Sequence, residues 1–522
     1  MSSTIRRAGA VIAAAVLSAT VGMAAPAYAA PKNDVDKLTK AVTVNAVLGH
    51  LRQLQGISDS QGGNRAAGQP GYAASVNYVV KQLRKAGYNP TIQEFPYVDY
   101  ADNTALTRLD PATTWTYGSD FLQDSFDTGT PEGTATAALA PVDLVTPGTL
   151  STSGCEPADF ADFVPGSIAL VQRGTCGFAV KALNAQTAGA SAVIVMSNGQ
   201  PGLLRMIGDA TGLTIPAIFV TTDVGLDLAA APGAQVTVTV DAEHRVSYNV
   251  LAETGKGDDA NVVMAGAHLD SVLEGPGIND NGTGSAALLE VALQMKKVKP
   301  TNTVRFAWWG AEEEGLIGST HYVANLPQEQ QDAIALYLNF DMIGSPNYVF
   351  GVYDGDQSDI PATVAIPAGS ERIEAVFKDY FAQRGYFSSA TEFSGRSDYG
   401  PFIAAGIPAG GLFTGAEGVK TADEAAKFGG LAGTAYDPCY HAACDNLTGE
   451  GQDPAVYVPL SNQYRLKGNV NRLALDVNSD AVAAAILTFA FDTTGIPERP
   501  APEARTFGGG VDLDALRDRY AE

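Results

Sequence analysis

Three neighbouring stretches decide the fold of this chain: VVMAGAHLD at 262–270, GPGINDNGTGSAALLEVALQM at 275–295 and NTVRFAWWGAEEE at 302–314. The first and third begin with near-continuous apolar runs of strand length, and residues 285–295 between them are typical of a helix. Continuous apolar strands that alternate with helices indicate a parallel or mixed sheet with both faces covered. We therefore predict an α/β fold with a mixed, mostly parallel sheet covered by helices on both faces.

A metal-ligand residue type ends or follows each predicted strand. His268 ends the first strand, Glu312 to Glu314 follow the second, and Asp341 follows a third at 335–340. Ligand sites of open α/β sheets lie beyond the carboxyl ends of the strands. Each residue alone has an ordinary explanation, such as a turn, a cap or a solvated helix start, but so many unpaired acids at one edge would repel without cations. The pattern predicts a metal site, and imidazole with carboxylate suits zinc better than calcium or magnesium.

Five ordered motifs closely resemble the secreted M28 peptidases, in particular the bacterial leucine-type aminopeptidases. They are GAHLDS at 266–271, GPGINDNG at 275–282, FAWWGAEE at 306–313, NFDMIG at 339–344 and CYH at 439–441. The resemblance implies a zinc exopeptidase fold and a peptide hydrolase. A second likeness, carried by GSIALVQRGTC at 166–176, is to the protease-associated (PA) domain, and it implies a strand-rich α+β insert.

The M28 resemblance implies a role for each matching residue. Asp280 would bridge two zinc ions, with His268 and Asp341 completing one site and Glu313 and His441 the other. The remaining implied roles are a general base at Glu312, an oxyanion donor at Tyr440, orientation of His268 by Asp270, a border of the first side-chain pocket at Arg396 and Phe413, and a cis peptide between Asp280 and Asn281. The extra acid Glu314 leaves a shift of one residue open.

These assignments predict a secreted di-zinc aminopeptidase that removes large apolar N-terminal residues, such as Leu, from peptides or proteins with a free N-terminus. Three alternatives stay open: an M28-type carboxypeptidase, which would need a cationic pocket, a glutaminyl cyclase-like enzyme, and a catalytically dead peptide-binding protein. The net charge of −24, from 33 Lys and Arg against 57 Asp and Glu, argues against nucleic acid and membrane surfaces as partners. We expect a monomer.

The N-terminal segment has the layout of a secretory signal. Arg6 and Arg7 precede an apolar stretch at 8–23 and the small-residue sequence Ala27-Tyr28-Ala29. The predicted division of the chain is a signal peptide at 1–29, a first peptidase part at 30–132, a PA-like insert at 133–243, a second peptidase part at 244–495 and a tail at 496–522. The insert contains no histidine, so we expect it to take no part in catalysis.

The four cysteines suit two disulfides in an oxidising compartment. Proximity in the sequence pairs Cys155 with Cys176 and Cys439 with Cys444. A four-thiolate zinc site is the rival, but the spacing of the first pair is too long for a usual zinc knuckle. The resemblance also leaves calcium open as a cofactor, without support. Asp476 and Asp480 match positions that the family links to a calcium site, but the N-terminal acid expected as their partner is missing.

Overall fold

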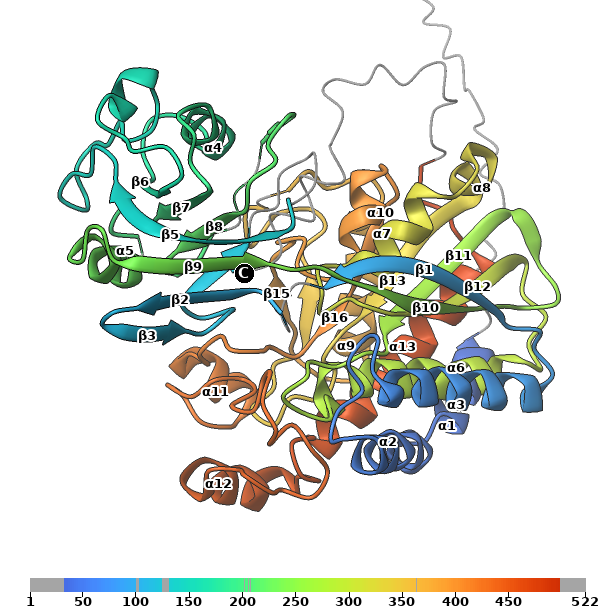
Figure 1. Cartoon of the computed structure of the whole chain (residues 1–522). Coiled ribbons are helices and arrows are strands. Elements are labelled where there is room, and N and C mark those ends of the chain that lie inside the picture. Colours follow the sequence, from blue (N-terminus) through green and yellow to red (C-terminus); the bar gives the residue numbers. More distant parts are fainter. Residues whose placement is uncertain are drawn as a thin grey trace, which may run out of the picture.

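The computed structural model describes residues 32–99, 103–123, 131–200, 202–204, 206, 208–362 and 364–497, and it contains two eight-stranded sheets (Figure 1). The predicted signal peptide and all but the first two residues of the predicted tail lie outside the described residues. Each sheet has its own hydrophobic core, so the two sheets mark two folding units.

The first sheet has the order β1-β10-β12-β11-β13-β16-β14-β15. Its strands are β1 (Thr91–Asp99), β10 (Glu243–Glu253), β11 (Asp258–His268), β12 (Asn302–Trp309), β13 (Ile334–Phe340), β14 (Gly351–Tyr353), β15 (Ser389–Thr391) and β16 (Ala409–Phe413). The central strands β12, β11, β13 and β16 run parallel. The pairs β1–β10, β10–β12 and β14–β16 are antiparallel, and β14 pairs parallel with β15. The predicted mixed, mostly parallel sheet is confirmed.

Helices cover both faces of this sheet because its strands are apolar on both faces. Phe306 and Trp308 of β12 pack into one core, while the alternating Ala307 and Trp309 pack into another. The first core is closed by α1 (Lys32–Ala41), α2 (Val44–Ser60), α3 (Pro70–Ala86), α6 (Gly284–Met295), α9 (Ser370–Gln383) and α13 (Arg472–Phe491). The opposite face carries α7 (Ile317–Ala324) and α10 (Gly400–Ala404), with α8 (Gln328–Ala333) near its end (Figure 1).

Helix α13 is long and apolar enough to cross a membrane, but 78% of its most apolar window is buried inside the protein. It is therefore the central core helix of the first unit. Two shorter helices, α11 (Ala422–Phe428) and α12 (Pro454–Tyr464), flank the loop that carries His441.

The second sheet has the order β3-β2-β9-β5-β6-β7-β8-β4. Its elements are β2 (Ala105–Leu109), β3 (Ala112–Trp115), β4 (Phe121–Gln123), β5 (Gly133–Pro141), η1 (Pro157–Phe160), β6 (Ile168–Gln172), α4 (Phe178–Thr187), β7 (Ala192–Met196), β8 (Ala217–Val220), α5 (Thr222–Ala229) and β9 (Gln235–Val240). This is the strand-rich insert that the sequence predicts.

The second sheet extends beyond the insert expected at 133–243. Strands β2, β3 and β4 precede residue 133, yet β2 pairs with β9 and β4 pairs with β8. We therefore propose that the inserted unit begins near residue 104 instead. The chain leaves the first sheet after Asp99 and returns at Glu243, and these two residues are direct neighbours in the β1–β10 pair. The second unit is thus inserted at one end of an antiparallel pair.

Candidate metal centre and active site

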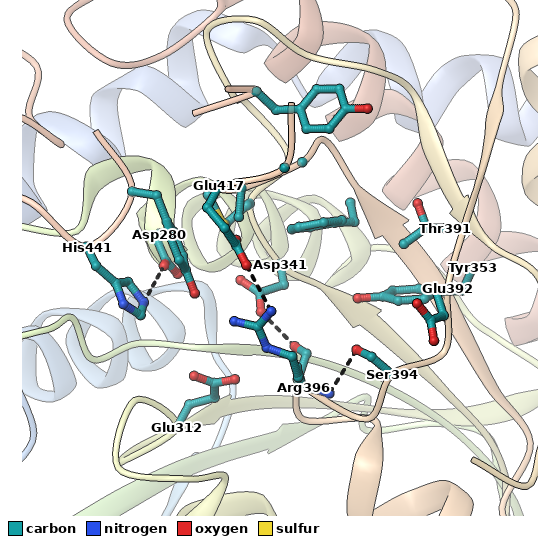
Figure 2. Close-up of a pocket in the computed structure, with 18 of the residues that line it drawn as sticks. Asp280, Glu312, Asp341, Tyr353, Thr391, Glu392, Ser394, Arg396, Glu417 and His441 are labelled. Atoms are coloured by element: carbon teal, nitrogen blue, oxygen red, sulfur yellow. Dashed lines mark hydrogen bonds and ion pairs between the residues drawn. The ribbon is translucent and has the colours of Figure 1, made fainter. Parts of the chain in front are cut away.

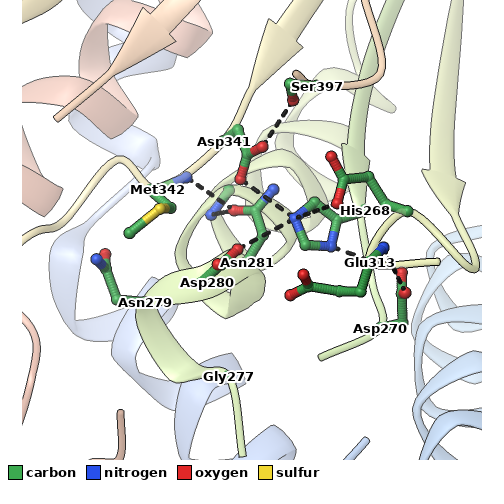
Figure 3. Close-up of polar contacts among 12 residues, drawn as sticks. His268, Asp270, Gly277, Asn279, Asp280, Asn281, Glu313, Asp341, Met342 and Ser397 are labelled. Atoms are coloured by element: carbon green, nitrogen blue, oxygen red, sulfur yellow. Dashed lines mark hydrogen bonds and ion pairs between the residues drawn. The ribbon is translucent and has the colours of Figure 1, made fainter. Parts of the chain in front are cut away.

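The carboxyl ends of the parallel strands bring His268, Glu313 and Asp341 together (Figure 3). His268 is the last residue of β11, Asp341 directly follows β13, and Glu312 and Glu313 follow β12 after a short turn. Because β11 lies between β12 and β13 and all three run parallel, these side chains reach the same edge of the sheet. Asp280 joins them from η2 (Ile278–Thr283), a short π-helical turn between β11 and α6.

Asp280 lies between two imidazole rings. Its Oδ1 is 3.2 Å from Nε2 of His268, and its Oδ2 is 3.4 Å from Nε2 of His441. Each oxygen of one carboxylate therefore faces a different histidine. The peptide bond between Asp280 and Asn281 is cis, as the M28 resemblance implies.

Each histidine has a further acid beside it. Asp341 Oδ1 lies 3.2 Å from Nε2 of His268, and Glu313 Oε2 lies 3.0 Å from Nε2 of His441. Glu312 lies beside His268 and Asp341 without a close contact, since its Oε2 is 3.9 Å from Nε2 of His268. All five predicted ligands and the predicted base thus gather in one place, and two triplets, His268 with Asp280 and Glu313, and His268 with Glu312 and Asp341, have ligand atoms within 4.8 Å of one another.

The electrostatics of this cluster favour a cation. Burial and the charge of Asp280 raise the pKa of Glu313 to about 7, and burial raises the pKa of Glu312 well above its usual value. Burial disfavours a charged His441, but Asp280 and Glu313 outweigh it and raise the pKa of this imidazole to about 11. The buried Oε1 of Glu313 has no hydrogen-bond partner among the described residues. Unsatisfied buried carboxylates beside two imidazoles are the donor set that zinc prefers, so the residues fit the metal.

Neighbouring polar groups contact the predicted ligands. Asp270 Oδ1 lies 3.5 Å from Nδ1 of His268, on the side of the ring away from Asp280, and its Oδ2 accepts a hydrogen bond from the backbone N–H of Glu313. Ser397 donates a hydrogen bond of 2.6 Å to Oδ2 of Asp341, which leaves Oδ1 facing His268. Such partners fix the rotamers of metal ligands.

Two further residues that contact the segment before Asp280 have no signal in the sequence analysis. Asp445 accepts hydrogen bonds from the backbone N–H groups of Asn279 and Asp280, at 2.8 and 3.0 Å. Arg65 is fully buried and binds carbonyl groups of the loop that precedes Asp280. The only clue to Asp445 is that it follows Cys444, whereas the segment around Arg65 contains no motif that the sequence analysis recognised.

A cavity of about 250 Å³ opens beside the cluster. Figure 2 shows Asp280, Asp341, Glu312 and His441 on one side of it. The rest of its lining includes Tyr353, Thr391, Glu392, Ser394, Arg396, Ser397, Tyr399, Phe413, Glu417, Tyr436 and Tyr440. The predicted pocket residues Arg396 and Phe413 therefore line the cavity. Arg396 Nη1 donates a 2.9 Å hydrogen bond to Glu417 Oε1, which compensates its charge.

Both predicted disulfides are present, so the four-thiolate zinc site is excluded. The bond between Cys439 and Cys444 closes the loop that carries Tyr440 and His441. The Tyr440 ring stacks on the His441 ring with centroids 3.8 Å apart, and burial raises the pKa of the phenol. His441 has a φ of 53°, which few residues other than glycine adopt.

A third group of acids, Asp354, Asp356 and Glu374, lies elsewhere in the first unit. Backbone N–H groups of 358–360 already occupy the Asp354 carboxylate, and Lys378 and a backbone N–H occupy Glu374. We assign no ion to this group. The calcium pair Asp476 and Asp480 stays a prediction, because among the residues described no third acid joins the two within ligand distance.

The sequence matches the Peptidase family M28 profile over residues 249–453 and the PA domain profile over 136–228. An aminopeptidase of Pseudomonas aeruginosa is 47% identical over 85% of this chain and 81% of its own length. The chain belongs to peptidase family M28. The probable lipoprotein aminopeptidase LpqL of Mycobacterium tuberculosis is 40% identical to this M28 chain over 90% of the chain and 89% of its own length. The probable leucine aminopeptidase 2 of Aspergillus fumigatus is 40% identical over 84% and 81%.

Solved structures agree with this assignment. An aminopeptidase from Aneurinibacillus sp. strain AM-1 superposes with a TM-score of 0.60 at 25% identity, covering 90% of this chain and 98% of its own. A zinc aminopeptidase from Bacillus subtilis has the same fold, with a TM-score of 0.56 at 22% identity over 85% of this chain and 94% of its own. The M28 chain described here is therefore an aminopeptidase with an inserted PA domain.

Proposed function

We propose that this aminopeptidase holds two zinc ions per chain and removes large apolar residues, such as Leu, from the N-termini of peptides. The observation that carries the two-ion proposal is the placement of Asp280, whose two carboxylate oxygens face His268 and His441 separately. Asp341 would complete the first ion's ligands and Glu313 the second's. One bridging carboxylate, with one imidazole and one further carboxylate per ion, is a complete donor set for such a pair.

Zinc, when bound, lowers the pKa of a water molecule and polarises the substrate carbonyl. Glu312 would take the proton of the attacking water and return it to the departing amine. Its position supports this role, because it borders the cavity close to the metal ligands but has no closer contact than 3.9 Å to His268. Burial raises its pKa, which makes the carboxylate a stronger base. Tyr440, stacked on His441 at the rim, would donate a hydrogen bond to the developing oxyanion.

The cavity supports an exopeptidase acting at a free amine. Glu312 and Asp341 are acids at its inner end, where they would receive the α-ammonium group of the substrate. Phe413 and Tyr353 give the side-chain pocket aromatic surface, which favours a large apolar residue. A carboxypeptidase would need an unpaired cation for the terminal carboxylate, and Arg396 is instead paired with Glu417.

We also propose that the enzyme is exported. The segment at 1–29 has the layout of a signal peptide, and two disulfides with no free cysteine suit an oxidising compartment. Its partners would be peptides or proteins with a free N-terminus, and we expect a monomer.

The test combines metal analysis with a substrate panel. The purified enzyme should contain two zinc ions per chain and should hydrolyse leucyl p-nitroanilide faster than the alanyl and glycyl compounds, with no cleavage of N-acetylated forms. Chelation should abolish turnover and zinc should restore it. Asp280→Ala should lose both ions, whereas Asp356→Ala, an exposed acid of the third group, should keep them. Cleavage of only N-blocked substrates, or pyroglutamate formation from glutaminyl peptides, would reject the aminopeptidase assignment in favour of the alternatives.

A further inference from the structure

Arg65 is a buried cation without an ion-pair partner among the described residues. It follows α2 in the segment before α3 and has no exposed surface. Burial lowers the pKa of its guanidinium to about 10, so the group stays charged at neutral pH. Its charge is offset only through space, by the acids Asp270, Asp445, Asp280 and Glu313. A buried charge is expensive unless its hydrogen bonds are satisfied.

All the side-chain hydrogen bonds of Arg65 go to one loop. Nε donates to the carbonyl of Pro276 at 2.8 Å, Nη2 donates to that of Gly277 at 2.6 Å, and Nη1 donates to that of Leu269. The backbone N–H of Arg65 adds a bond of 2.9 Å to Oγ of Ser271 in the same loop. A planar guanidinium with several fixed donors can hold three carbonyls at once, which the single ammonium group of lysine does less well.

This loop connects two predicted zinc ligands. Leu269 directly follows His268, and Gly277 stands three residues before Asp280. The loop is tightly packed at Gly277. The φ of this residue is 57°, and a Cβ at this position would lie 2.3 Å from the carbonyl oxygen of Asp280. Arg65 therefore ties together the two ends of the segment that separates the ligands.

We propose that Arg65 is a positioning residue for the metal centre: its guanidinium fixes the loop at 269–277 so that His268 and Asp280 face the same zinc ion. The inference rests on the proposed two-zinc function. It assigns Arg65 no contact with substrate or with the reacting atoms, and its effect on turnover passes through the metal ligands.

The direction in which zinc affinity changes when Arg65 is replaced distinguishes a positioning role from a purely electrostatic one. A positive charge close to a cation site opposes cation binding, so removing the charge alone would increase zinc affinity. Loss of the three carbonyl bonds would let the ligands separate and would decrease it. Removing a group that orients metal ligands typically costs about 10- to 100-fold in metal affinity.

The experiment measures zinc affinity by chelator competition on the full chain carrying Arg65→Met or Arg65→Lys. We expect affinity to fall about 10- to 100-fold for Arg65→Met and less for Arg65→Lys, which keeps the charge and part of the bonding. The visible spectrum of the cobalt-substituted protein should shift, and excess zinc should restore much of the lost turnover. Arg108→Met is the matched control: Arg108 is also buried and binds the carbonyls of Pro111 and Asp227, but it lies in the second sheet. It should lower stability and leave zinc affinity unchanged.

The outcomes are distinct. Two ions in the wild type with unchanged or higher affinity in both Arg65 variants would overturn the positioning role and leave the two-zinc function standing. Fewer than two ions in the wild type would overturn the proposed function itself. If Arg65→Met does not fold, Arg65→Lys decides, because a folded lysine variant with wild-type affinity and cobalt spectrum also contradicts the proposal.

Discussion

Glu312, Glu313 and Glu314 are consecutive acids with different surroundings. Glu312 and Glu313 line the cavity beside the two histidines. Glu314 instead lies near Tyr97. Burial, followed in size by the charge of Glu314, raises the pKa of the Tyr97 phenol. The frame that pairs Glu312 as base with Glu313 as ligand therefore agrees with the geometry, and a shift by one residue would place an acid outside the cavity.

Glu312→Gln should keep both zinc ions and lower kcat by about 10²- to 10⁴-fold, because the amide cannot accept the proton. Glu314→Gln should stay close to wild-type activity. Steady-state kinetics on leucyl p-nitroanilide, together with zinc analysis of both variants, checks this. Inactivation by Glu314→Gln with an active Glu312→Gln would show that the frame is displaced by one residue.

We expect Lys181 to give the PA-like unit a pH-dependent stability. It has no exposed surface, donates a 2.5 Å hydrogen bond to the carbonyl of Ser153, and burial lowers its pKa to about 8. The unfolded chain keeps this proton up to about pH 10.4. Between these values the unfolded state binds more protons, so the contribution of Lys181 to the free energy of unfolding rises with pH.

Urea unfolding across this pH range should show that rise in the wild type and a smaller rise in Lys181→Met. The exposed Lys256 offers the control, since Lys256→Met should keep the wild-type slope. Equal slopes in Lys181→Met and the wild type would contradict the assignment.

At the scale of elements, the two disulfides have different consequences. Cys439–Cys444 closes a loop between residues only 5 apart that carries His441, and Asp445 at its end holds the Asp280 segment. Cys155–Cys176 closes a longer loop of separation 21 within the second unit, away from the cavity. Because the longer loop loses more entropy when it is closed, Cys155–Cys176 should contribute more to stability. Cys439–Cys444 should matter more for function, because its loop carries His441.

Cys155→Ser/Cys176→Ser should lower the free energy of unfolding by about 3 kcal/mol and leave zinc content unchanged. Cys439→Ser/Cys444→Ser should cost only about 2 kcal/mol but weaken zinc binding and turnover. Denaturant unfolding and chelator competition on both variants measure the two effects. If the variant lacking Cys439–Cys444 keeps full zinc affinity, the closed loop is not needed to place His441.

At the scale of the whole molecule, the insertion point predicts that the two units are separable. Asp99 and Glu243 are paired neighbours, so the gap left by the insert can be closed by a hairpin turn. The hydrophobic cores of the second sheet contain residues between 106 and 240 only, and the cores around the first sheet contain none of them.

Replacing residues 100–242 by Asn-Gly should give a folded, two-zinc protein that still hydrolyses leucyl p-nitroanilide. Zinc analysis, circular dichroism and kinetics on this short substrate and on longer peptides check the expectation. A folded but inactive deletion variant would show that the insert contributes to the site; a change confined to longer peptides would place its role in substrate access.

The central sheet and the groups at its edge can be predicted from local patterns in the chain. Continuous apolar runs such as 262–267 and 303–309 are typical of strands that are buried on both faces. Parallel pairing of these strands brings His268, Glu312 and Asp341 to one edge of the sheet, independently of the other segments. Helix α3 also carries local signals at both ends, because Pro70 begins it and Gly87 caps it.

The surroundings of these groups depend on contacts between segments that are far apart in the chain. Arg65 meets the loop at 269–277 across more than 200 residues of sequence, and Asp445 reaches Asp280 across 165. Strand β2 joins the second sheet because it pairs with β9, not through any feature of its own pattern. Periodicity and spacing report which face of an element is buried, but a hydrogen bond between distant segments depends on how those elements pack, so its partners become visible only in the folded chain.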